Sequence, residues 1–369
     1  MRGEGGASVI TGSACCERCP GATPDDLALF ARRRILKAAV FPPGPAGPPR
    51  GQTGGARPLP AQNRLAQRGM YRDSPAHLYR AVTGQILDVS AHFVTIGRAG
   101  REQRFALTAD ATAWRGWTLE PSAVRPGDEA VIRLVPSRPG VADRIWSSIG
   151  RVCGTIVERD SGSLLVAESA TRTPQVVVIS DRASAKIRVR FPNLRPGYLI
   201  DIIGLRRGEV LEGTLPATYQ PPYLASQVIH APPPPAGLPA ESITGSAVWH
   251  EPADEPYGVL GLGYPAVDPS AGCVDDTAAA NVPGESAGYR QLPYLAVGTS
   301  LRVRNECSHL WWTLPVTRCA PVARLFNDHC ATCRTSPRGR VADLTLASFV
   351  ALGGELQAGC FNATLTIGR

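Results

Sequence analysis

The feature that most constrains the fold is an internal repeat of about seventy residues. The run VTGQI at 82–86 matches VCGTI at 152–156, and the turn sequence VRPGD at 124–128 matches LRPGY at 194–198. Between these matches, both copies alternate runs of β-branched residues with turns that contain Gly or Pro. β-Branched residues favour strands, and Gly and Pro favour turns. The repeat therefore predicts two copies of one unit with about five short strands, at 78–149 and 150–225.

Five strands in so short a unit favour a closed barrel, because an open sheet of this size would leave long edges unpaired. The Gly-x-Ile strand followed by an Arg-Pro-Gly turn resembles the small bacterial OB-like barrel modules. To bind single-stranded nucleic acid, such a barrel needs a basic groove with aromatic side chains on which bases stack. The second copy has few aromatic residues, so no nucleic-acid partner is expected. Trp114 and Trp117 are expected to pack at the end of the first barrel. Cys153 is expected to be a buried free thiol without a catalytic role.

The net charge of +8 is unevenly distributed. Residues 1–77 hold eleven basic and five acidic residues, whereas residues 243–369 hold nine basic and eleven acidic residues. The first segment reads as a disordered basic leader and linker. Four consecutive prolines at 232–235 predict a stiff linker over 226–242. No run of about 18 apolar residues occurs, so no transmembrane helix is expected.

Six of the ten cysteines lie in the carboxyl-terminal third: Cys273, Cys307, Cys319, Cys330, Cys333 and Cys360. An even, local set of this kind is typical of a disulfide framework in an oxidising compartment. We therefore expect an extracytoplasmic protein, secreted or at the cell surface. The run RRRILK at 32–37 resembles a twin-arginine export motif, but the apolar stretch that should follow it is missing.

The pair Cys330 and Cys333 beside His329 leaves zinc binding and redox chemistry open as alternatives to disulfides. A zinc site needs four ligands, and no second pair occurs nearby, so neither a metal nor a cofactor is expected. The three cysteines near the amino terminus, Cys15, Cys16 and Cys19, have no assigned role.

Beyond residue 242, strands are predicted at 245–249, 300–304, 311–316, 322–326 and 364–367. One helix is predicted from Asp343 to Leu352, with glycines after its end. Asp343 is expected to be structural, accepting backbone N–H groups at the start of this helix.

The carboxyl-terminal motifs follow a recognisable order, LP at 292–293, GTSLRV at 298–303, FND at 326–328, ADLT at 342–345 and GCFNATLTI at 359–367. This order resembles the double-psi β-barrels of the rare lipoprotein A, expansin and barwin-like group. The expected fold is therefore all-β, with two tandem small OB-like barrels followed by a six-stranded double-psi barrel with one short helix at 243–369.

The resemblance implies a chemical role for Asp328. In lytic members of the group a single carboxylic acid at this position protonates the glycosidic oxygen and then acts as the base while the sugar closes an anhydro ring. The alternative is that Asp328 only caps the turn before Cys330. Tyr289 replaces the cleft histidine of lytic members, which weakens the case for cleavage.

Other polar and aromatic residues are candidates for ligand contacts. His250 or His329 could supply an imidazole, and Asp276 falls where the group often has an acid near the cleft. A platform on which sugar rings stack could be formed by Trp249, Trp311, Trp312 and Tyr289. Trp311 and Trp312 are neighbours on a predicted strand, so one of them must face outwards.

Together these observations predict an extracytoplasmic protein that binds cell-wall polysaccharide, either peptidoglycan or another glycan. If it is an enzyme, it is a lytic transglycosylase that uses Asp328. The alternative is a non-enzymatic, disulfide-stapled scaffold for a polysaccharide, or for a protein partner that contacts the tandem barrels.

Overall fold

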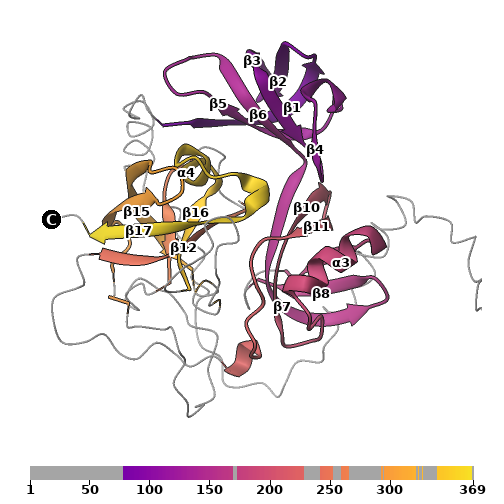
Figure 1. The fold of residues 1–369 in the computed structure, drawn as a ribbon, viewed down its shortest axis with the longest axis vertical. Helices are drawn as coiled ribbons and strands as arrows, with labels where there is room; N and C mark the ends of the chain where they lie inside the picture. The colour runs from indigo at the N-terminus through magenta and orange to yellow at the C-terminus, as the bar shows by residue number, and fades with distance from the viewer. Residues whose placement is uncertain are drawn as a thin grey trace, which may run out of the picture. The chain divides into compact units, whose positions relative to one another are not determined.

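The computed structural model describes residues 78–168, 173–227, 242–251, 259–265, 292–293, 295–320, 323, 326 and 339–367. All of them belong to one compact unit of the chain, Pro42–Arg369. They form three small closed β-barrels in chain order, which confirms the all-β prediction (Figure 1). Within the described residues no helix is long and apolar enough to cross a membrane. The predicted leader at 1–77 lies outside the described residues.

The first two barrels share one strand order, which confirms the repeat. In each, the first strand pairs with the second and with the fourth long strand, and the third runs parallel to the last. The first barrel consists of β1 (Arg80–Val89), β2 (Phe93–Arg98), β3 (Arg101–Trp114), β4 (Thr118–Leu119), a 3-10 turn (Pro121–Ala123), β5 (Glu129–Leu134) and β6 (Val141–Ser147). The second consists of β7 (Ile149–Asp160), β8 (Ser163–Ala167), β9 (Gln175–Ile179), α3 (Asp181–Arg190), β10 (Leu199–Arg207) and β11 (Val210–Pro216).

The Arg-Pro-Gly turn has the same structural task in both copies. β1 and β7 each carry a bulge directly after the matching residues Ile86 and Ile156. Gly127 N–H donates to the Ile86 carbonyl at 2.7 Å, and Gly197 N–H donates to the Ile156 carbonyl at 2.8 Å. Both glycines have left-handed backbones, with φ of +92° and +86°, which other residues adopt only with strain. The turn glycine therefore anchors the bulge.

The glycine of the Gly-x-Ile strand is required for a different reason. A Cβ atom on Gly84 would lie 2.8 Å from the carbonyl oxygen of Gly97, and one on Gly154 would lie 2.1 Å from that of Ala167. Both distances are shorter than a side chain can tolerate, so any larger residue would push the first two strands apart. The repeated glycine thus sets how closely these barrels close.

Helix α3 was not predicted, because each copy of the repeat was interpreted as strands joined by turns. Only Ala183 and Ile187 are buried on this helix. They are four residues apart and so lie on the same face. Two buried apolar residues among many charged ones give too weak a helical periodicity to be recognised in the sequence. Figure 1 shows α3 lying along the outside of the second barrel.

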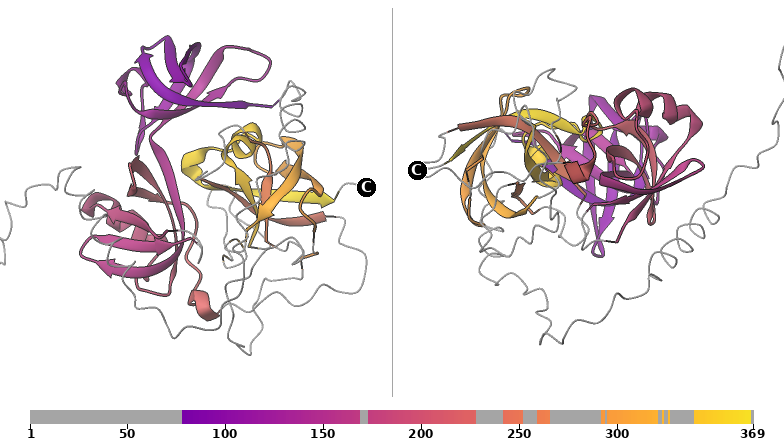
Figure 2. Two further views of the ribbon diagram at one scale, coloured as in Figure 1. Left: turned by 180° about the vertical axis from the view of Figure 1, so that it is seen from behind. Right: turned by 90° about the horizontal axis from the view of Figure 1, so that it is seen from below.

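The third barrel is a mixed, closed six-stranded barrel, as predicted, with the order β12-β16-β13-β15-β14-β17. Figure 2 shows this barrel from two further sides. Its pairings are preserved when each of the first three strands along the chain is exchanged for the strand three places later, β12 for β15, β13 for β16 and β14 for β17, so two similar halves build it. Its elements are β12 (Ser242–His250), β13 (Leu262–Tyr264), β14 (Ser300–Asn305), β15 (Trp311–Cys319), β16 (Arg340–Thr345), α4 (Leu346–Ala351), a 3-10 turn (Leu356–Ala358) and β17 (Cys360–Ile367).

The helix begins later than predicted. Asp343 belongs to strand β16, and α4 starts at Leu346. The residue that caps the helix is Thr345, whose hydroxyl accepts the N–H of Ser348 at 3.3 Å. The prediction that Asp343 is the cap is therefore wrong, because pairing with β12 and β13 holds it in a strand. Of the strand predicted at 322–326, the two described residues, Ala323 and Phe326, are not in strand conformation.

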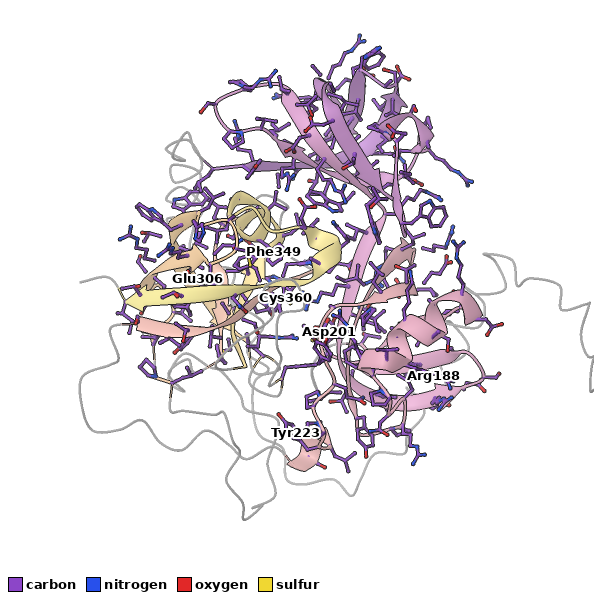
Figure 3. The ribbon with its side chains drawn as sticks, in the orientation of Figure 1. Arg188, Asp201, Tyr223, Glu306, Phe349 and Cys360 are labelled. Carbon is purple, nitrogen blue, oxygen red and sulfur yellow. The ribbon has the colours of Figure 1, made fainter. Side chains whose placement is uncertain are left out.

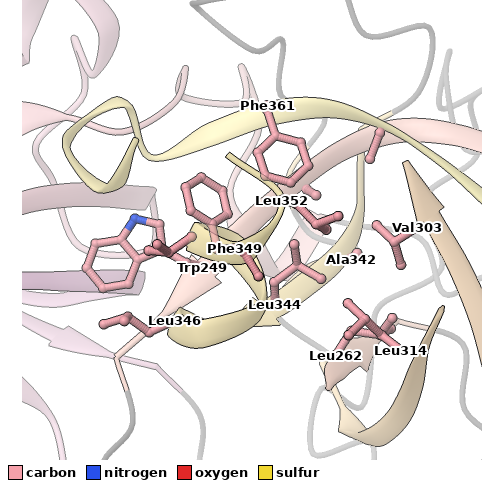
Figure 4. Close-up of a cluster of buried hydrophobic side chains, with 14 of the residues drawn as sticks. Trp249, Leu262, Val303, Leu314, Ala342, Leu344, Leu346, Phe349, Leu352 and Phe361 are labelled. Atoms are coloured by element: carbon pink, nitrogen blue, oxygen red, sulfur yellow. The ribbon is translucent and has the colours of Figure 1, made fainter. Parts of the chain in front are cut away.

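Aliphatic and aromatic side chains together fill the third barrel (Figure 4). Phe349 from α4 stacks on Phe361 from β17, with ring centroids 4.7 Å apart. Trp249 from β12 is 1% exposed, and its indole N–H donates to the Leu356 carbonyl at 2.9 Å. Trp249 is therefore a core residue, and its predicted role as a sugar platform is wrong.

A buried carboxylate joins the second and third barrels (Figure 3). Asp201 on β10 is completely buried. Arg151 on β7 donates to both of its oxygens, at 2.8 and 2.6 Å, and Arg340 from β16 donates to Oδ2 at 2.7 Å. Thr218 donates to Oδ2 at 3.0 Å. Burial alone would raise the pKa of Asp201, but the two arginines outweigh it and hold the pKa below its ordinary value.

The remaining donors of the two arginines are also directed across the boundary between the barrels. Arg151 Nη1 donates to the carbonyls of Trp249 and Gly359, at 2.6 and 2.8 Å. Arg340 Nη1 lies 3.0 Å from Cys153 Sγ, and its guanidinium covers the ring of Phe326. Burial raises the pKa of the Cys153 thiol well above its ordinary value, so this cysteine stays neutral, and it is not part of a disulfide.

The turn before β17 also contacts the first two barrels. Glu355 pairs with Arg133 of β5, and the indole N–H of Trp146 on β6 donates to Gln357. Gly359 has φ of +79°, and a Cβ atom there would lie 2.7 Å from the Cβ of Ala217.

Trp114 and Trp146 belong to the same buried cluster as the core of the third barrel. Trp114 thus packs inside, whereas Trp117 is 58% exposed, which is contrary to prediction.

We expect Asp201→Asn to lower the free energy of unfolding by about 3–5 kcal/mol, because it leaves two buried arginines without a counter-charge. Asp88→Asn, at an exposed position on β1, is the control and should change it little. Urea unfolding of both variants measures the difference. Equal stability of the two variants would contradict the structural importance of Asp201.

Gly359→Ala should destabilise the chain more than Gly127→Ala. Both substitutions force alanine into a left-handed backbone, at about 1–2 kcal/mol, but nothing lies within 4 Å of a Cβ at Gly127. The clash with Ala217 should add about 1–3 kcal/mol at Gly359. Denaturant titrations of the two variants test this, and a smaller loss for Gly359→Ala would show that the contact is loose.

Candidate functional site

Three side chains on the outside of the third barrel form a polar cluster centred on Asp343. His250 Nδ1 lies 3.4 Å from Asp343 Oδ1, and Arg318 Nη2 lies 2.7 Å from Oδ2. The three side chains come from β12, β16 and β15. All three are mostly buried, with 13%, 19% and 27% of the side chains of His250, Asp343 and Arg318 exposed. The cluster therefore holds a carboxylate, an imidazole and a guanidinium in fixed positions.

A glycine between them allows the Arg318 side chain to reach Asp343. Gly263 of β13 pairs with Arg318 on one side and with Asp343 on the other, so it separates them in the barrel wall. A Cβ atom at Gly263 would lie 3.4 Å from the Cγ and Nε atoms of Arg318 and 2.9 Å from the Cβ of Ala320. Because Gly263 has no side chain, the arginine can cross the strand and reach the carboxylate.

The charge of Asp343 is fixed by its neighbours. Burial alone would raise the pKa of Asp343, but Arg318, His250 and Arg340 outweigh it and hold the pKa well below its usual range. Asp343 is therefore ionised at neutral pH and cannot serve as a proton donor. It orients the guanidinium and the imidazole instead.

Asp343 also lies against His250. Nδ1 of the imidazole is 3.4 Å from Asp343 Oδ1, a charge contact that does not have the geometry of a hydrogen bond. An imidazole that lies against a carboxylate can accept a proton or bind a hydroxyl group. His250 was singled out from the sequence as an imidazole source, and Asp343 as a structural residue, but nothing in the sequence placed them together.

Of the aromatic candidates in the described residues, Trp311 is the one that is exposed. It is 39% exposed, with the guanidinium of Arg302 3.7 Å from its ring centroid, whereas Trp312 is 8% exposed and lies in the core. This confirms that one of the two neighbouring tryptophans faces outwards. Alternation along a strand was the signal that predicted it.

The other predicted site residues are not brought into this cluster by the described part of the chain. Asp328, His329, Tyr289 and Asp276 lie outside the described residues, so their predicted roles stay predictions. Arg318 was missed, because one arginine at the end of a strand carries no signal of its own.

The cysteine prediction is corrected at one position. Cys360 is buried on β17 and is not part of a disulfide. Its Sγ lies 3.8 Å from the carbonyl oxygen of Ala217, and it packs against Val248. Cys307 and Cys319 are both disulfide-bonded. Three further candidates lie outside the described residues: Cys273, Cys330 and Cys333.

Within the described ranges, no three His, Cys, Asp or Glu side chains are grouped in a way that could hold a metal ion. No protein-family model matches the sequence, and no curated protein matches it.

Asp343→Asn should make stability less dependent on pH. The folded-state pKa of Asp343 is lowered, so its stabilising effect is present above the unfolded pKa of about 4 and is lost as the pH falls through the folded pKa. The variant should lose about 1–3 kcal/mol near pH 7, and the difference should shrink below about pH 4. Urea unfolding between pH 3 and 7 measures this. A difference that is constant with pH would argue against an ionised Asp343.

Proposed function

We propose that this chain is an extracytoplasmic protein whose third barrel binds cell-wall glycan. The observation that carries the proposal is the Asp343 cluster on a six-stranded barrel with two similar halves. This strand pairing is the one expected of a double-psi barrel, and the order of motifs along the chain resembles the rare lipoprotein A and expansin group. The two preceding barrels are in turn of the OB-like kind.

The chemistry of the cluster suits a polyhydroxylated ligand. Sugars present hydroxyl groups that both donate and accept hydrogen bonds. His250 supplies an imidazole, Arg318 supplies several N–H groups, and both lie against an ionised carboxylate.

A second candidate is cleavage of the bound glycan by Asp328, as in lytic transglycosylases. The motif FND at 326–328 supports it. The Asp343 carboxylate does not supply the required acid, because its lowered pKa keeps it ionised. The proton donor would therefore have to be Asp328 itself, with its pKa raised.

Binding is tested by sedimenting the full chain with purified peptidoglycan sacculi. The native chain should sediment, and His250→Gln should weaken binding about tenfold, the effect of losing one hydrogen-bonding group worth about 1.4 kcal/mol. Thr244→Val, on the same strand β12, is the control and should bind like the native chain. A native chain that stays in solution would refute glycan binding and would favour a protein partner.

Cleavage is tested on the same material by mass spectrometry of the released products. The native chain should release anhydro-muropeptides, and Asp328→Asn should abolish them while still sedimenting with the sacculi. Equal yields from the two proteins, or no anhydro products from either, would rule out Asp328 as the catalytic acid.

A further inference from the structure

The exposed face of α3 is the most unusual surface in the described part of the chain. Three basic side chains are exposed on this ten-residue helix: Arg182, Lys186 and Arg188. A fourth, Arg190, is half-buried at its end. None of these four residues forms an ion pair within the described ranges. Asp181, the one acidic residue of the helix, lies in its first turn, where it interacts with the helix dipole.

Apolar groups interrupt this basic face. Val189 is 80% exposed, which is unusual for a large aliphatic side chain, and Ala185 is also exposed. Arg182, Lys186 and Val189 follow the spacing of one helix face. Figure 3 labels Arg188 on the same helix. The helix therefore presents cations with an apolar surface between them.

An aromatic ring lies at each end of this face. The guanidinium of Arg182 is 5.8 Å from the ring centroid of Trp117, and that of Arg190 is 4.7 Å from the ring centroid of Tyr219. Trp117 is 58% exposed and Tyr219 is 43% exposed. Arg182 and Arg190 are eight residues apart, or about 12 Å along the helix axis.

Trp117 reaches the helix because its loop packs on the second barrel. Gly116 precedes it with φ of +83°, and a Cβ atom there would lie 3.4 Å from Leu205 and 3.5 Å from Thr214. The loop at the end of β3 is therefore held against β10 and β11, with Trp117 beside the first turn of α3. The arrangement is specific, since it uses residues from two barrels.

We propose that this α3 face, made of Trp117, Arg182, Lys186, Arg188, Val189 and Tyr219, binds an anionic polysaccharide. The cations would pair with carboxylate or phosphate groups, and the rings at both ends would stack on sugar faces. The inference rests on the proposed function for its ligand class, but it concerns a separate surface on the second barrel. It assigns the tandem barrels the capture of charged wall polymer.

The arrangement of the rings favours a glycan over single-stranded nucleic acid. Proteins that bind single-stranded nucleic acid place successive aromatic side chains along a positively charged groove, so that neighbouring bases stack on them in turn. Here the two rings are separated by the length of the helix, and cations lie between them. An acidic protein segment would use the cations but would not need the exposed faces of both rings.

The test uses the full chain and two forms of one polymer, polygalacturonate and its fully methyl-esterified form, which has the same backbone without charge. Isothermal titration should show binding of polygalacturonate that weakens as salt is added, because bound counter-ions are released. The ester should bind at least about tenfold more weakly, a loss of about 1.4 kcal/mol. No binding of polygalacturonate, or equal binding of the ester, would overturn the proposal.

Matched variants identify the surface. Replacing Arg182, Lys186 and Arg188 by Gln should remove most of the affinity and of the salt dependence. The control replaces three exposed arginines of the first barrel by Gln, namely Arg101, Arg125 and Arg138, and should bind like the native chain. An equal loss in the control would show that net charge alone is responsible, which would refute a site on α3.

Two further polyanions identify the ligand class. Trp117→Ala combined with Tyr219→Ala should weaken binding of polygalacturonate and leave binding of polyglutamate, which has no sugar faces, unchanged. Tighter native binding of polyglutamate would favour an acidic protein, and tighter binding of oligothymidylate would favour nucleic acid; either result would overturn the proposal. A native chain that binds polygalacturonate but not sacculi would refute only the function proposed for the third barrel. A native chain that binds sacculi but not polygalacturonate would refute only the α3 site.

Discussion

The position of the third barrel depends on one buried carboxylate. Asp201 neutralises Arg151 from its own barrel and Arg340 from the next. A charge removed from water is tolerated only when it is paired and its remaining hydrogen-bonding groups are satisfied. Here backbone carbonyls, the Cys153 sulfur and the face of Phe326 satisfy the rest of the two guanidinium groups. The two barrels can therefore be separated only by exposing this network.

The candidate site is linked to the same boundary through its own strands. Arg340 is three residues before Asp343 on β16. Glu251 directly follows His250, accepts two hydrogen bonds from Arg206 of β10 and accepts the backbone N–H of Arg151. Both strands that carry the carboxylate and the imidazole are thus fastened to the second barrel close to the site. The spacing between His250 and Asp343 is set by the pairing of β12 with β16, and contacts to the second barrel hold both strands in place.

The sequence was informative where backbone geometry demands a particular residue. Gly84 and Gly154 face a carbonyl across a narrow strand pair, and the turn glycines adopt left-handed backbones, so these positions repeat visibly. The sequence was uninformative where charged residues interrupt the apolar pattern of a strand. β16 contains Arg340 and Asp343, whose partners lie on other strands, and so its end was interpreted as the start of a helix. The Asp343 cluster could not be predicted either, since it depends on which strands are neighbours in the closed barrel.

The buried network also bears on how such a chain can change over time. The first two barrels are copies of one unit and make their key contacts locally, through a bulge and a turn in the same copy. A duplication can therefore reproduce that unit whole. The third barrel is different, because Arg340 and the turn that ends at Gly359 fit only a neighbour that offers Asp201 and the small side chain of Ala217. Exchange of the third barrel between related chains by recombination should succeed only when the second barrel is inherited with it.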